Sequence, residues 1–193
     1  DKQSPLLGNH LTLGYDKKII ARDLSVEIPQ GELTVIIGPN ACGKSTLLRT
    51  LSRLLAPMEG QVVLDGEAIS SYPTKEIARR LGLLPQSPNS PAGITVRELV
   101  SRGRYPHQQL FGRWRNEDAQ AVEQAMQATS VDHLAEQTVD TLSGGQRQRV
   151  WIAMVLAQQT PLLLLDEPTT WLDITHQIEL MELMRSLNRQ HGR

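Results

Sequence analysis

The chain has 193 residues, of which 39% are hydrophobic and 21% are charged, and its formal net charge at pH 7 is −1. This length suits one large domain, or one domain with an insert, and leaves little room for two independent domains. The near-zero charge excludes a global bias toward nucleic acid or anionic lipid, and no apolar run approaches the ~20 residues that a membrane helix needs. The single cysteine, Cys42, excludes an internal disulfide. Because the start shows no signal pattern, a trimmed cytoplasmic protein is expected.

The first predicted elements are antiparallel strands over residues 11–29, where polar and apolar residues alternate around a turn at 15–18. A near-continuous run of β-branched residues at 33–37 then predicts a strand that is buried on both faces. Leucines at helical spacing predict a helix over 44–55.

The segment GPNACGKS, residues 38–45, lies between that strand and that helix and matches a phosphate-binding loop. In such a loop, backbone N–H groups surround the nucleotide phosphates, Lys44 reaches the β- and γ-phosphates, and Ser45 offers its hydroxyl to Mg²⁺. The alternative is a glycine turn that only starts a helix, and the strand-loop-helix context disfavours it. The candidate nucleotide-binding residues are Gly38, Pro39, Asn40, Ala41, Cys42, Gly43, Lys44, Ser45 and Thr46.

The middle of the chain changes from strands to helices. Strands are predicted at 61–66 and 81–85, the second ending at Gln86, with a short helix between them at 74–80. From about 95 to 139 the strand signal is weak, and helices are predicted at 96–103, 117–129 and 131–137. This pattern indicates a helical insert in an α/β domain.

The segment RYPHQQLFGRWR, residues 104–115, mixes arginines with Tyr105 and Trp114. Such a mixture fits single-stranded nucleic acid, a protein partner or ordinary packing of the insert. Net charge near zero disfavours nucleic acid. The five histidines lack metal-ligand spacing and are taken as structural or surface groups.

The sequence LSGGQ at 142–146 predicts a helix start, and the helix itself is predicted over 146–158. Ser143 and Gln146 fit a capping box, while Gly144 and Gly145 leave the first N–H groups of the helix open to an anion. On local grounds alone, an ordinary helix start is the favoured interpretation.

Two carboxylates follow the apolar strand predicted at 162–165. A carboxylate at the end of a buried strand needs a cation partner, and beside a phosphate loop Mg²⁺ best explains Asp166. Glu167 is placed to polarise an attacking water. The alternative is that both acids only end the strand before Pro168. A last helix is predicted from about Ile174.

The order of these motifs, from phosphate loop through Gln86, LSGGQ and LLLLDE to WLD at 171–173, resembles the ATP-binding subunits of ABC transporters. The resemblance runs from Leu11 to the last residue. Three segments are similar to the ATPases of bacterial ferric-siderophore importers, with the ferric-enterobactin type closest: GRYPHQQLFGRW at 103–114, DTLSGGQRQRVWIAMVLAQ at 140–158 and LDEPTTWLDITHQIELM at 165–181.

This resemblance implies an α/β fold with a P-loop NTPase core, whose mostly parallel sheet is flanked by helices, an N-terminal antiparallel β subdomain and a helical insert that carries LSGGQ. A single domain over 1–193 would comprise 11–94 (β subdomain and first half of the core), 95–158 (insert) and 159–193 (second half of the core). The C-terminal part of the family fold, with its switch histidine, is expected to be missing. His191 precedes that position, so it does not inherit the role, and poor hydrolysis by these residues alone is expected.

The resemblance also implies roles for individual residues. Tyr15 would stack on adenine, although taken alone it is an exposed turn tyrosine. Gln86, otherwise a polar residue at a strand end, would lie near Mg²⁺ and the attacking water. The turn Ser143–Gln146 would bind the γ-phosphate held by a second subunit, and Asp173 would lie at that interface or cap the last helix. The implied catalytic residues are Glu167, Lys44 and Gln86, and the implied metal ligands are Ser45, Gln86 and Asp166.

The implied cofactors are ATP and Mg²⁺, and the implied assembly is a head-to-tail homodimer that sandwiches two ATP molecules. Its partners would be two membrane permease subunits and, indirectly, a siderophore-binding protein, with no nucleic acid. The protein would lie peripherally on the cytoplasmic face of the bacterial inner membrane and would power import of an iron-siderophore complex. The alternatives are an importer of haem, cobalamin or another metal chelate, a soluble ABC ATPase acting on nucleic acid or ribosomes, and a phosphate-loop kinase.

Two residues of the predicted phosphate loop, Ala41 and Cys42, allow further predictions. Ala41 stands where the family most often has glycine, and a positive φ there would cost about 1–2 kcal/mol. Lys44 and the helix N-terminus could lower the pKa of the Cys42 thiol. Alkylation of Cys42 is therefore expected to block nucleotide binding, and bound ATP is expected to protect it.

Overall fold

The computed structural model of the chain describes residues 5–29, 43–84, 89–108, 112–165 and 182. The chain divides into two compact units, and the boundary between them falls after Ile77. The predicted strand at 33–37 and the last helix, apart from the helical Glu182, lie outside the described residues. We call the described residues 5–77 the first unit and the described residues 78–165 the second unit, and describe each by itself.

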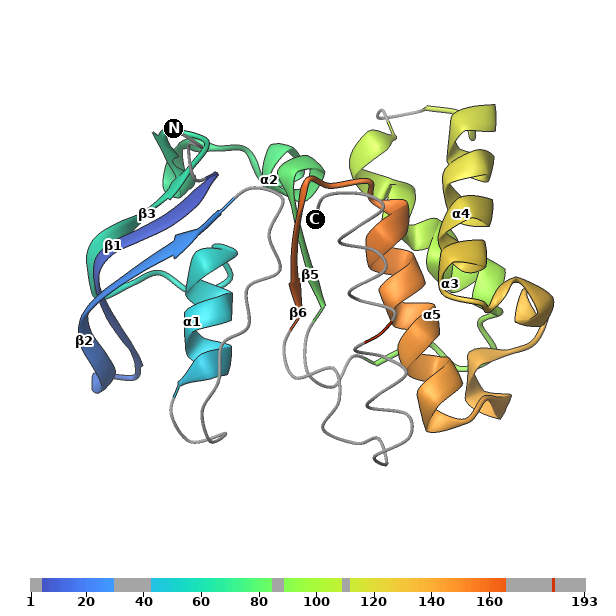
Figure 1. Ribbon diagram of the computed structural model, residues 1–193, viewed down its shortest axis with the longest axis horizontal. Coiled ribbons are helices and arrows are strands. Elements are labelled where there is room, and N and C mark those ends of the chain that lie inside the picture. Colours follow the sequence, from blue (N-terminus) through green and yellow to red (C-terminus); the bar gives the residue numbers. More distant parts are fainter. Residues whose placement is uncertain (1–4, 30–42, 85–88, 109–111, 166–181, 183–193) are drawn as a thin grey trace. The chain divides into compact units, whose positions relative to one another are not determined.

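The first unit contains an antiparallel sheet in the order β2-β1-β3-β4 (Figure 1). Strands β1 (Leu6–Tyr15) and β2 (Lys18–Ile28) form a hairpin, β3 spans Glu59–Leu64 and β4 spans Glu67–Ala68. A two-residue turn joins β1 to β2, with φ of 48° at Asp16 and 64° at Lys17. This left-handed pair suits the twist of a two-residue hairpin. The predicted antiparallel strands are confirmed, and β1 begins earlier than expected.

Helix α1 (Lys44–Leu51) contacts β1, and its leucines Leu47, Leu48 and Leu51 are all buried. The prediction that this helix reaches residue 55 is wrong. Arg53 adopts a left-handed backbone with φ of 66°, which ends the helix, and Leu54 is exposed. The Arg53 guanidinium instead donates to the carbonyl oxygen of Tyr72 and, at 2.8 Å, to Thr74 Oγ1.

A short 3₁₀ turn at Ile69–Ser71 leads to helix α2 (Thr74–Arg80), whose bounds match the prediction. In the second unit, strands β5 (Leu81–Leu84) and β6 (Leu162–Leu165) pair in parallel, with Leu81 opposite Leu162. Both are short apolar runs, and their parallel pairing agrees with a mostly parallel α/β core. Segments far apart in the sequence therefore lie side by side.

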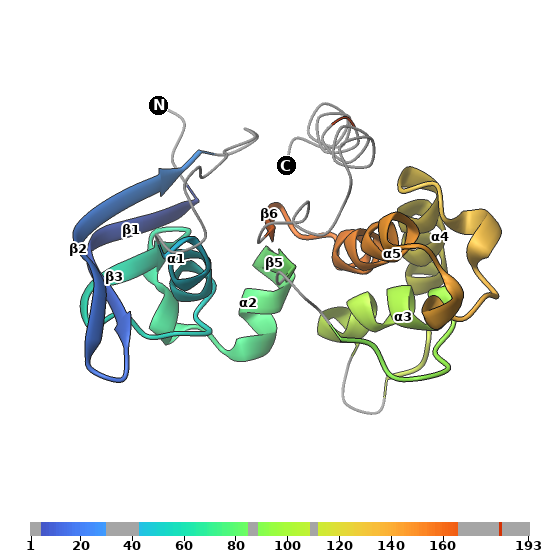
Figure 2. The same ribbon diagram turned by 90° about the horizontal axis from the view of Figure 1, so that it is seen from below.

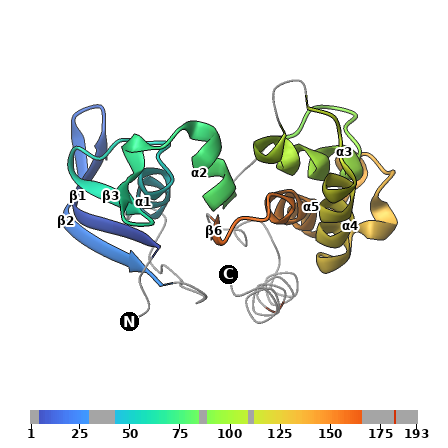
Figure 3. The same ribbon diagram turned by 90° about the horizontal axis from the view of Figure 1, so that it is seen from above.

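The helices of the second unit pack around α5 (Gly144–Ala157). Figures 2 and 3 show α5 between the β5–β6 pair and helices α3 (Val96–Ser101) and α4 (Asn116–Ala128). Its buried residues run almost around its circumference, which is typical of a central helix. They are Val150, Trp151, Ile152, Ala153, Val155, Leu156 and Ala157. Three 3₁₀ turns, at Arg102–His107, Asp132–Leu134 and Val139–Thr141, connect these helices.

The helix predicted at 131–137 is wrong, because only the 3₁₀ turn Asp132–Leu134 forms there. The carbonyl groups after this turn form hydrogen bonds with α3. The carbonyl oxygens of Ala135 and Gln137 accept from the N–H groups of Arg97 and Val96, at 3.0 and 2.9 Å. These carbonyls satisfy the first turn of α3, which otherwise lacks intrahelical partners.

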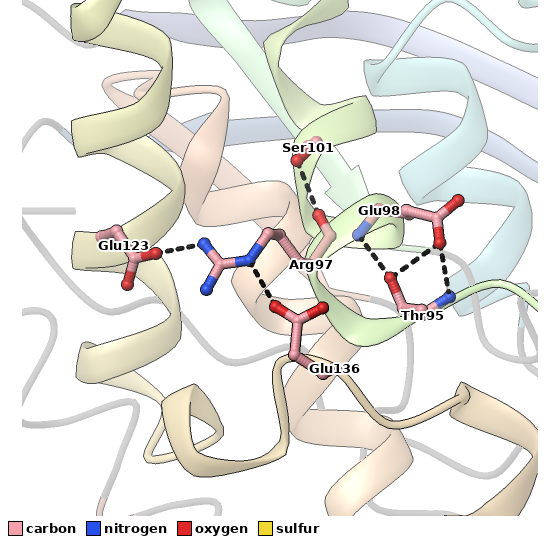
Figure 4. Close-up of polar contacts among 6 residues, drawn as sticks. All are labelled: Thr95, Arg97, Glu98, Ser101, Glu123 and Glu136. Carbon is pink, nitrogen blue, oxygen red and sulfur yellow. Dashed lines mark hydrogen bonds and ion pairs between the residues drawn. The ribbon is translucent and has the colours of Figure 1, made fainter.

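Figure 4 shows polar contacts of α3, from Thr95 at its start to Ser101 at its end. Thr95 and Glu98 form a capping box, and Ser101 donates its hydroxyl to the Arg97 carbonyl at 2.6 Å. Arg97 pairs with Glu123 of α4 and, at 3.0 Å, with Glu136. The two carboxylates raise the pKa of Arg97, so α3 is tied by charge to α4 and to the segment after it. In the parts of the chain just described, no helix is long and apolar enough to cross a membrane.

Candidate nucleotide-binding site

Gly43 lies within the predicted phosphate loop and is the N-cap residue of α1. Its φ of 84° and ψ of 20° are left-handed, and a Cβ there would lie 2.5 Å from Ile20 Cγ2 of β2. Both the backbone angle and the space therefore require glycine. Lys44 and Ser45 follow as the first two residues of α1, where N–H groups without intrahelical partners and the helix dipole favour a phosphate.

Tyr15 lies beside the first turn of the same helix. Its hydroxyl is 2.6 Å from Thr46 Oγ1, and either oxygen can donate the hydrogen. Thr46 is 2% exposed, whereas Tyr15 is 40% exposed. The structure thus brings together two of the predicted nucleotide-binding residues, and it presents an aromatic ring close to the end of the predicted phosphate loop.

The turn Ser143–Gln146 forms the predicted capping box at the start of α5. Ser143 Oγ accepts from the Gln146 N–H at 3.2 Å, and Gln146 Oε1 accepts from the Ser143 N–H at 3.1 Å. The helix begins at Gly144, two residues earlier than predicted. A Cβ on Gly144 would meet nothing within 4 Å, so the space around it does not require glycine. Because glycine disfavours a helix, this position suggests close approach by a ligand or partner.

Arg104 fits one of the three alternatives given for the segment 104–115, ordinary packing of the insert. Arg104 is 4% exposed, and its Nε donates to Asp118 Oδ1 at 2.9 Å. Nη1 donates to the carbonyl oxygen of Ala157 at 2.9 Å and to Gln159 Oε1 at 3.1 Å. Arg104 therefore has a packing role at the C-terminus of α5, whereas Tyr105 and Trp114 are exposed.

Sequence patterns did not reveal the partner of Arg104 or the contact between Tyr15 and Thr46. Asp118 lies in the first turn of a predicted helix, where an acidic residue is common. The signal that could have found it is the presence of charge at a position on the apolar face of α4, alongside Ala121, Val122 and Ala125. The Tyr15–Thr46 contact joins residues 31 positions apart, beyond any helical or strand period.

Several predicted site residues lie outside the described residues, and their predictions stand as made. They are Gly38, Pro39, Asn40, Ala41, Cys42, Gln86, Asp166, Glu167 and Asp173. Of Lys44 and Ser45, the backbone alone is described. The described geometry can do two things: hold an anion with an aromatic ring nearby at α1, and offer helix N–H groups to an anion at α5.

The chain matches the family model of the ABC transporter over residues 21–170. It is 67% identical over 187 residues to the ferric enterobactin transport ATP-binding protein FepC of Escherichia coli K12, covering 97% of this chain and 69% of that protein. It is 55% identical over 183 residues to the probable siderophore transport system ATP-binding protein YusV of Bacillus subtilis 168, covering 95% of this chain and 66% of that protein.

A solved structure is also similar to this fold. The cbiO1 protein of Clostridium perfringens, part of the ABC transporter complex cbiONQ, superposes with a TM-score of 0.85 at 28% identity. The match covers 98% of this chain and 75% of that chain. The sequence of motifs, the described geometry at α1 and these similarities all point to the same family.

Proposed function

Because this chain belongs to the ABC transporter family of ATP-binding proteins, we propose that it binds and hydrolyses ATP to power import of an iron-siderophore complex through a membrane permease. The observation that carries this proposal is the 67% identity, which extends over 97% of the chain, to a protein named for ferric enterobactin transport. The chain spans about two thirds of the length of its curated relatives, so the activity of the whole protein is included in the proposal.

The proposed ATP site is built around the N-terminus of α1. The loop backbone from Gly38 to Gly43 surrounds the phosphates, Lys44 contacts the β- and γ-phosphates, and Thr46 belongs to the same helix turn. Tyr15 offers the face of its ring to adenine. The left-handed Gly43 and the position of Tyr15 beside the same turn support this assignment.

Mg²⁺ is proposed as the second cofactor, with Ser45, Gln86 and Asp166 as its candidate ligands. Hydroxyl, amide and carboxylate oxygens form the donor set that this ion prefers. When bound, it would neutralise charge on the phosphates. Glu167 is proposed to accept a hydrogen bond from the attacking water and to orient it toward the γ-phosphorus, while Lys44 stabilises the charge that develops on the phosphate oxygens.

Two copies of the chain are proposed to complete each ATP site. The turn Ser143–Gln146 of one copy would bind the γ-phosphate held by α1 of the other, and Asp173 would lie at the same interface. The open space around Gly144 and the position of its N–H in the first turn of α5 support this role. The insert at 95–158 is proposed as the part that carries this turn.

Two permease subunits are the proposed direct partners, with the ATPase held on the cytoplasmic face of the inner membrane. A siderophore-binding protein would act only indirectly, through the permease. Closure of the dimer on ATP and its reopening after hydrolysis would change the side to which the permease opens. Free energy would thus pass from phosphate chemistry to transport without a covalent enzyme intermediate.

A chimera tests the proposal. An E. coli strain without its own ferric enterobactin transport ATP-binding protein would receive a version of that protein in which this chain replaces the matching segment. We expect uptake of radiolabelled ferric enterobactin to return, because every proposed contact of Lys44, Glu167 and Ser143 is retained. The same chimera with Lys44→Ala should accumulate but give no uptake.

Two outcomes would count against different parts of the proposal. The first uses strains that each lack the ATPase for one cargo. The assigned cargo would be overturned by a chimera that hydrolyses ATP and restores uptake of ferric hydroxamate or haem but not of ferric enterobactin. A folded chimera that fails to bind ATP would overturn the assigned activity itself.

A further inference from the structure

We propose that the hydroxyl of Thr46 is a positioning group for base recognition. It holds the Tyr15 side chain in an orientation that leaves the ring free to stack on adenine. This inference rests on the proposed function, because it assigns a role to Thr46 within the same ATP site.

The backbone of Tyr15 is fixed by the hairpin. Tyr15 is the last residue of β1 and pairs with Lys18 across the two-residue turn. A Cβ on the preceding residue, Gly14, would overlap the carbonyl oxygen of Lys18, so the two strands approach closely there. The position of the Tyr15 Cα is therefore set, and what remains variable is the direction of its side chain.

The contact with Thr46 fixes that direction. A separation of 2.6 Å is within the range of an O–H···O hydrogen bond. Thr46 is 2% exposed, so its hydroxyl has little access to water and needs a protein partner. Tyr15 as a residue remains 40% exposed while its hydroxyl is occupied. A ligand would therefore meet the ring of Tyr15 and not its hydroxyl.

The position of Thr46 in α1 places the Tyr15 contact next to the proposed phosphate-binding residues. Thr46 is the third residue of the helix and directly follows Lys44 and Ser45. The hydrogen bond consequently holds the ring against the same helix turn that is proposed to hold the phosphates. The close approach of Gly43 to Ile20 fixes that turn against the hairpin from its other end. The ring of Tyr15 is thus held beside the first turn of α1 before ATP arrives, which lowers the entropy cost of binding the base.

The test measures the binding of two ligands, Mg·ATP and Mg·tripolyphosphate, to the 193-residue chain by titration calorimetry. Tripolyphosphate carries the phosphates without a base. We expect Tyr15→Phe and Thr46→Val each to weaken ATP binding about three- to tenfold, the effect of one hydrogen bond. Tyr15→Phe should leave tripolyphosphate binding unchanged, and Thr46→Val should weaken it less than it weakens ATP binding. The double variant should bind ATP no more weakly than the weaker single variant, because both changes remove the same contact.

Matched controls separate positioning from stability. Thr46→Ser keeps the hydroxyl and should restore most of the ATP affinity. Thr50 lies one turn further along α1, is also buried, and donates its hydroxyl to the Thr46 carbonyl at 2.8 Å. Thr50→Val should therefore leave the ratio of the two affinities unchanged, even if it lowers the unfolding temperature.

Three results would overturn the inference while the proposed function survives. The first is that Tyr15→Phe binds ATP as tightly as wild type, and the second is that the losses of ATP affinity add in the double variant. The third is that Thr46→Val weakens the binding of ATP and of tripolyphosphate equally. The last result would mean that Thr46 acts on the phosphates directly. If Thr46→Val does not fold, Tyr15→Phe alone decides, since it keeps the partly exposed ring. Wild-type chain that binds neither ligand would overturn the proposed function, and this inference with it.

Discussion

The buried pair of Arg104 and Asp118 shows how one charged side chain can hold three segments together. Arg104 is 4% exposed and Asp118 is 3% exposed. Asp118 Oδ2 also accepts from the Arg115 N–H at 3.0 Å, and Arg104 donates to the last turn of α5. Each charge is thus paired and hydrogen-bonded, which is the condition for burying it at tolerable cost.

Removing one partner of this pair should destabilise the chain. Arg104→Met leaves the Asp118 carboxylate buried without its cation, and we expect the free energy of unfolding to fall by about 3–5 kcal/mol. Urea denaturation at pH 7 measures it. Arg102→Met, at an exposed position in the same 3₁₀ turn, should change the free energy by less than about 0.5 kcal/mol. Equal effects of the two substitutions would contradict the buried role of Arg104.

The same carboxyl predicts a dependence on pH. Burial raises the pKa of Asp118, but the Arg115 N–H and the Arg104 guanidinium lower it by more, so it lies below the ordinary 3.8. Its contribution to stability is therefore present above pH 3.8 and is lost as the pH falls through the lower pKa of the folded state. Between pH 7 and 5, this group should contribute no change. Asp118→Asn should be less stable at pH 7 and should show a shallower loss below pH 4, measured by urea denaturation.

Helix α5 meets a glycine near each of its ends, and the two glycines differ in what surrounds them. Gly103 lies against its last turns, where a Cβ would overlap the Met154 carbonyl oxygen and lie 3.1 Å from the Ala157 Cβ. Gly144 is the first residue of the helix and has open space around it. The close approach of the 3₁₀ turn Arg102–His107 to α5 depends on the first glycine, whereas the helix itself would tolerate alanine at the second.

Alanine at these two positions should therefore have opposite effects. Gly103→Ala should lower the free energy of unfolding by about 1–3 kcal/mol through overpacking. Gly144→Ala should leave it unchanged or raise it by up to about 1 kcal/mol, because alanine favours a helix. Thermal denaturation of the two variants compares them. In the chimera, Gly144→Ala should also reduce ATP hydrolysis, and a fully active chimera would contradict the role proposed for Gly144.

For the whole molecule, the proposed dimer requires that each ATP site combine parts of two copies. Two inactive chimeras, one with Lys44→Ala and one with Ser143→Arg, should then complement each other when mixed. In a mixed dimer, one site joins an intact phosphate loop to an intact Ser143–Gln146 turn. After random exchange about half of the dimers are mixed, and each mixed dimer has one intact site of its two. The ATPase rate should therefore reach about a quarter of the rate of the unmutated dimer. No recovery after verified subunit exchange would contradict the head-to-tail arrangement.

Much of the fold followed from local patterns in the sequence. The hairpin, α1, α2 and α4 appeared where alternation or helical spacing predicted them, and both parallel strands appeared where continuous apolar runs predicted them. The predicted helix ends were wrong where groups distant in the sequence bond to the segment concerned. The carbonyls at 135 and 137 bond to the start of α3, and the Arg53 side chain reaches the segment 72–74, which no local period reveals.

In the candidate site, too, the local features were predictable from the sequence and the contacts between elements were not. The capping box at Ser143 and the helix start at Lys44 were predictable because their hydrogen bonds or backbone angles involve residues within four positions. The Tyr15–Thr46 contact and the burial of Arg104 depend on packing between elements. The sequence left both packing and contact with a partner open for Arg104, because its buried partners, Asp118 and the Ala157 carbonyl, lie 14 and 53 residues away.

The parallel pairing of β5 with β6 has a consequence for how the chain is made. The hairpin β1–β2 joins neighbours across two residues, so it can close as soon as both strands leave the ribosome. Leu84, by contrast, meets its partner only after Leu165 has been synthesised, and the apolar helix α5 emerges before that strand does. During this interval, β5 and the helix α5 that contacts it lack the strand that pairs with β5, which is the stage at which a nascent chain most needs protection from aggregation.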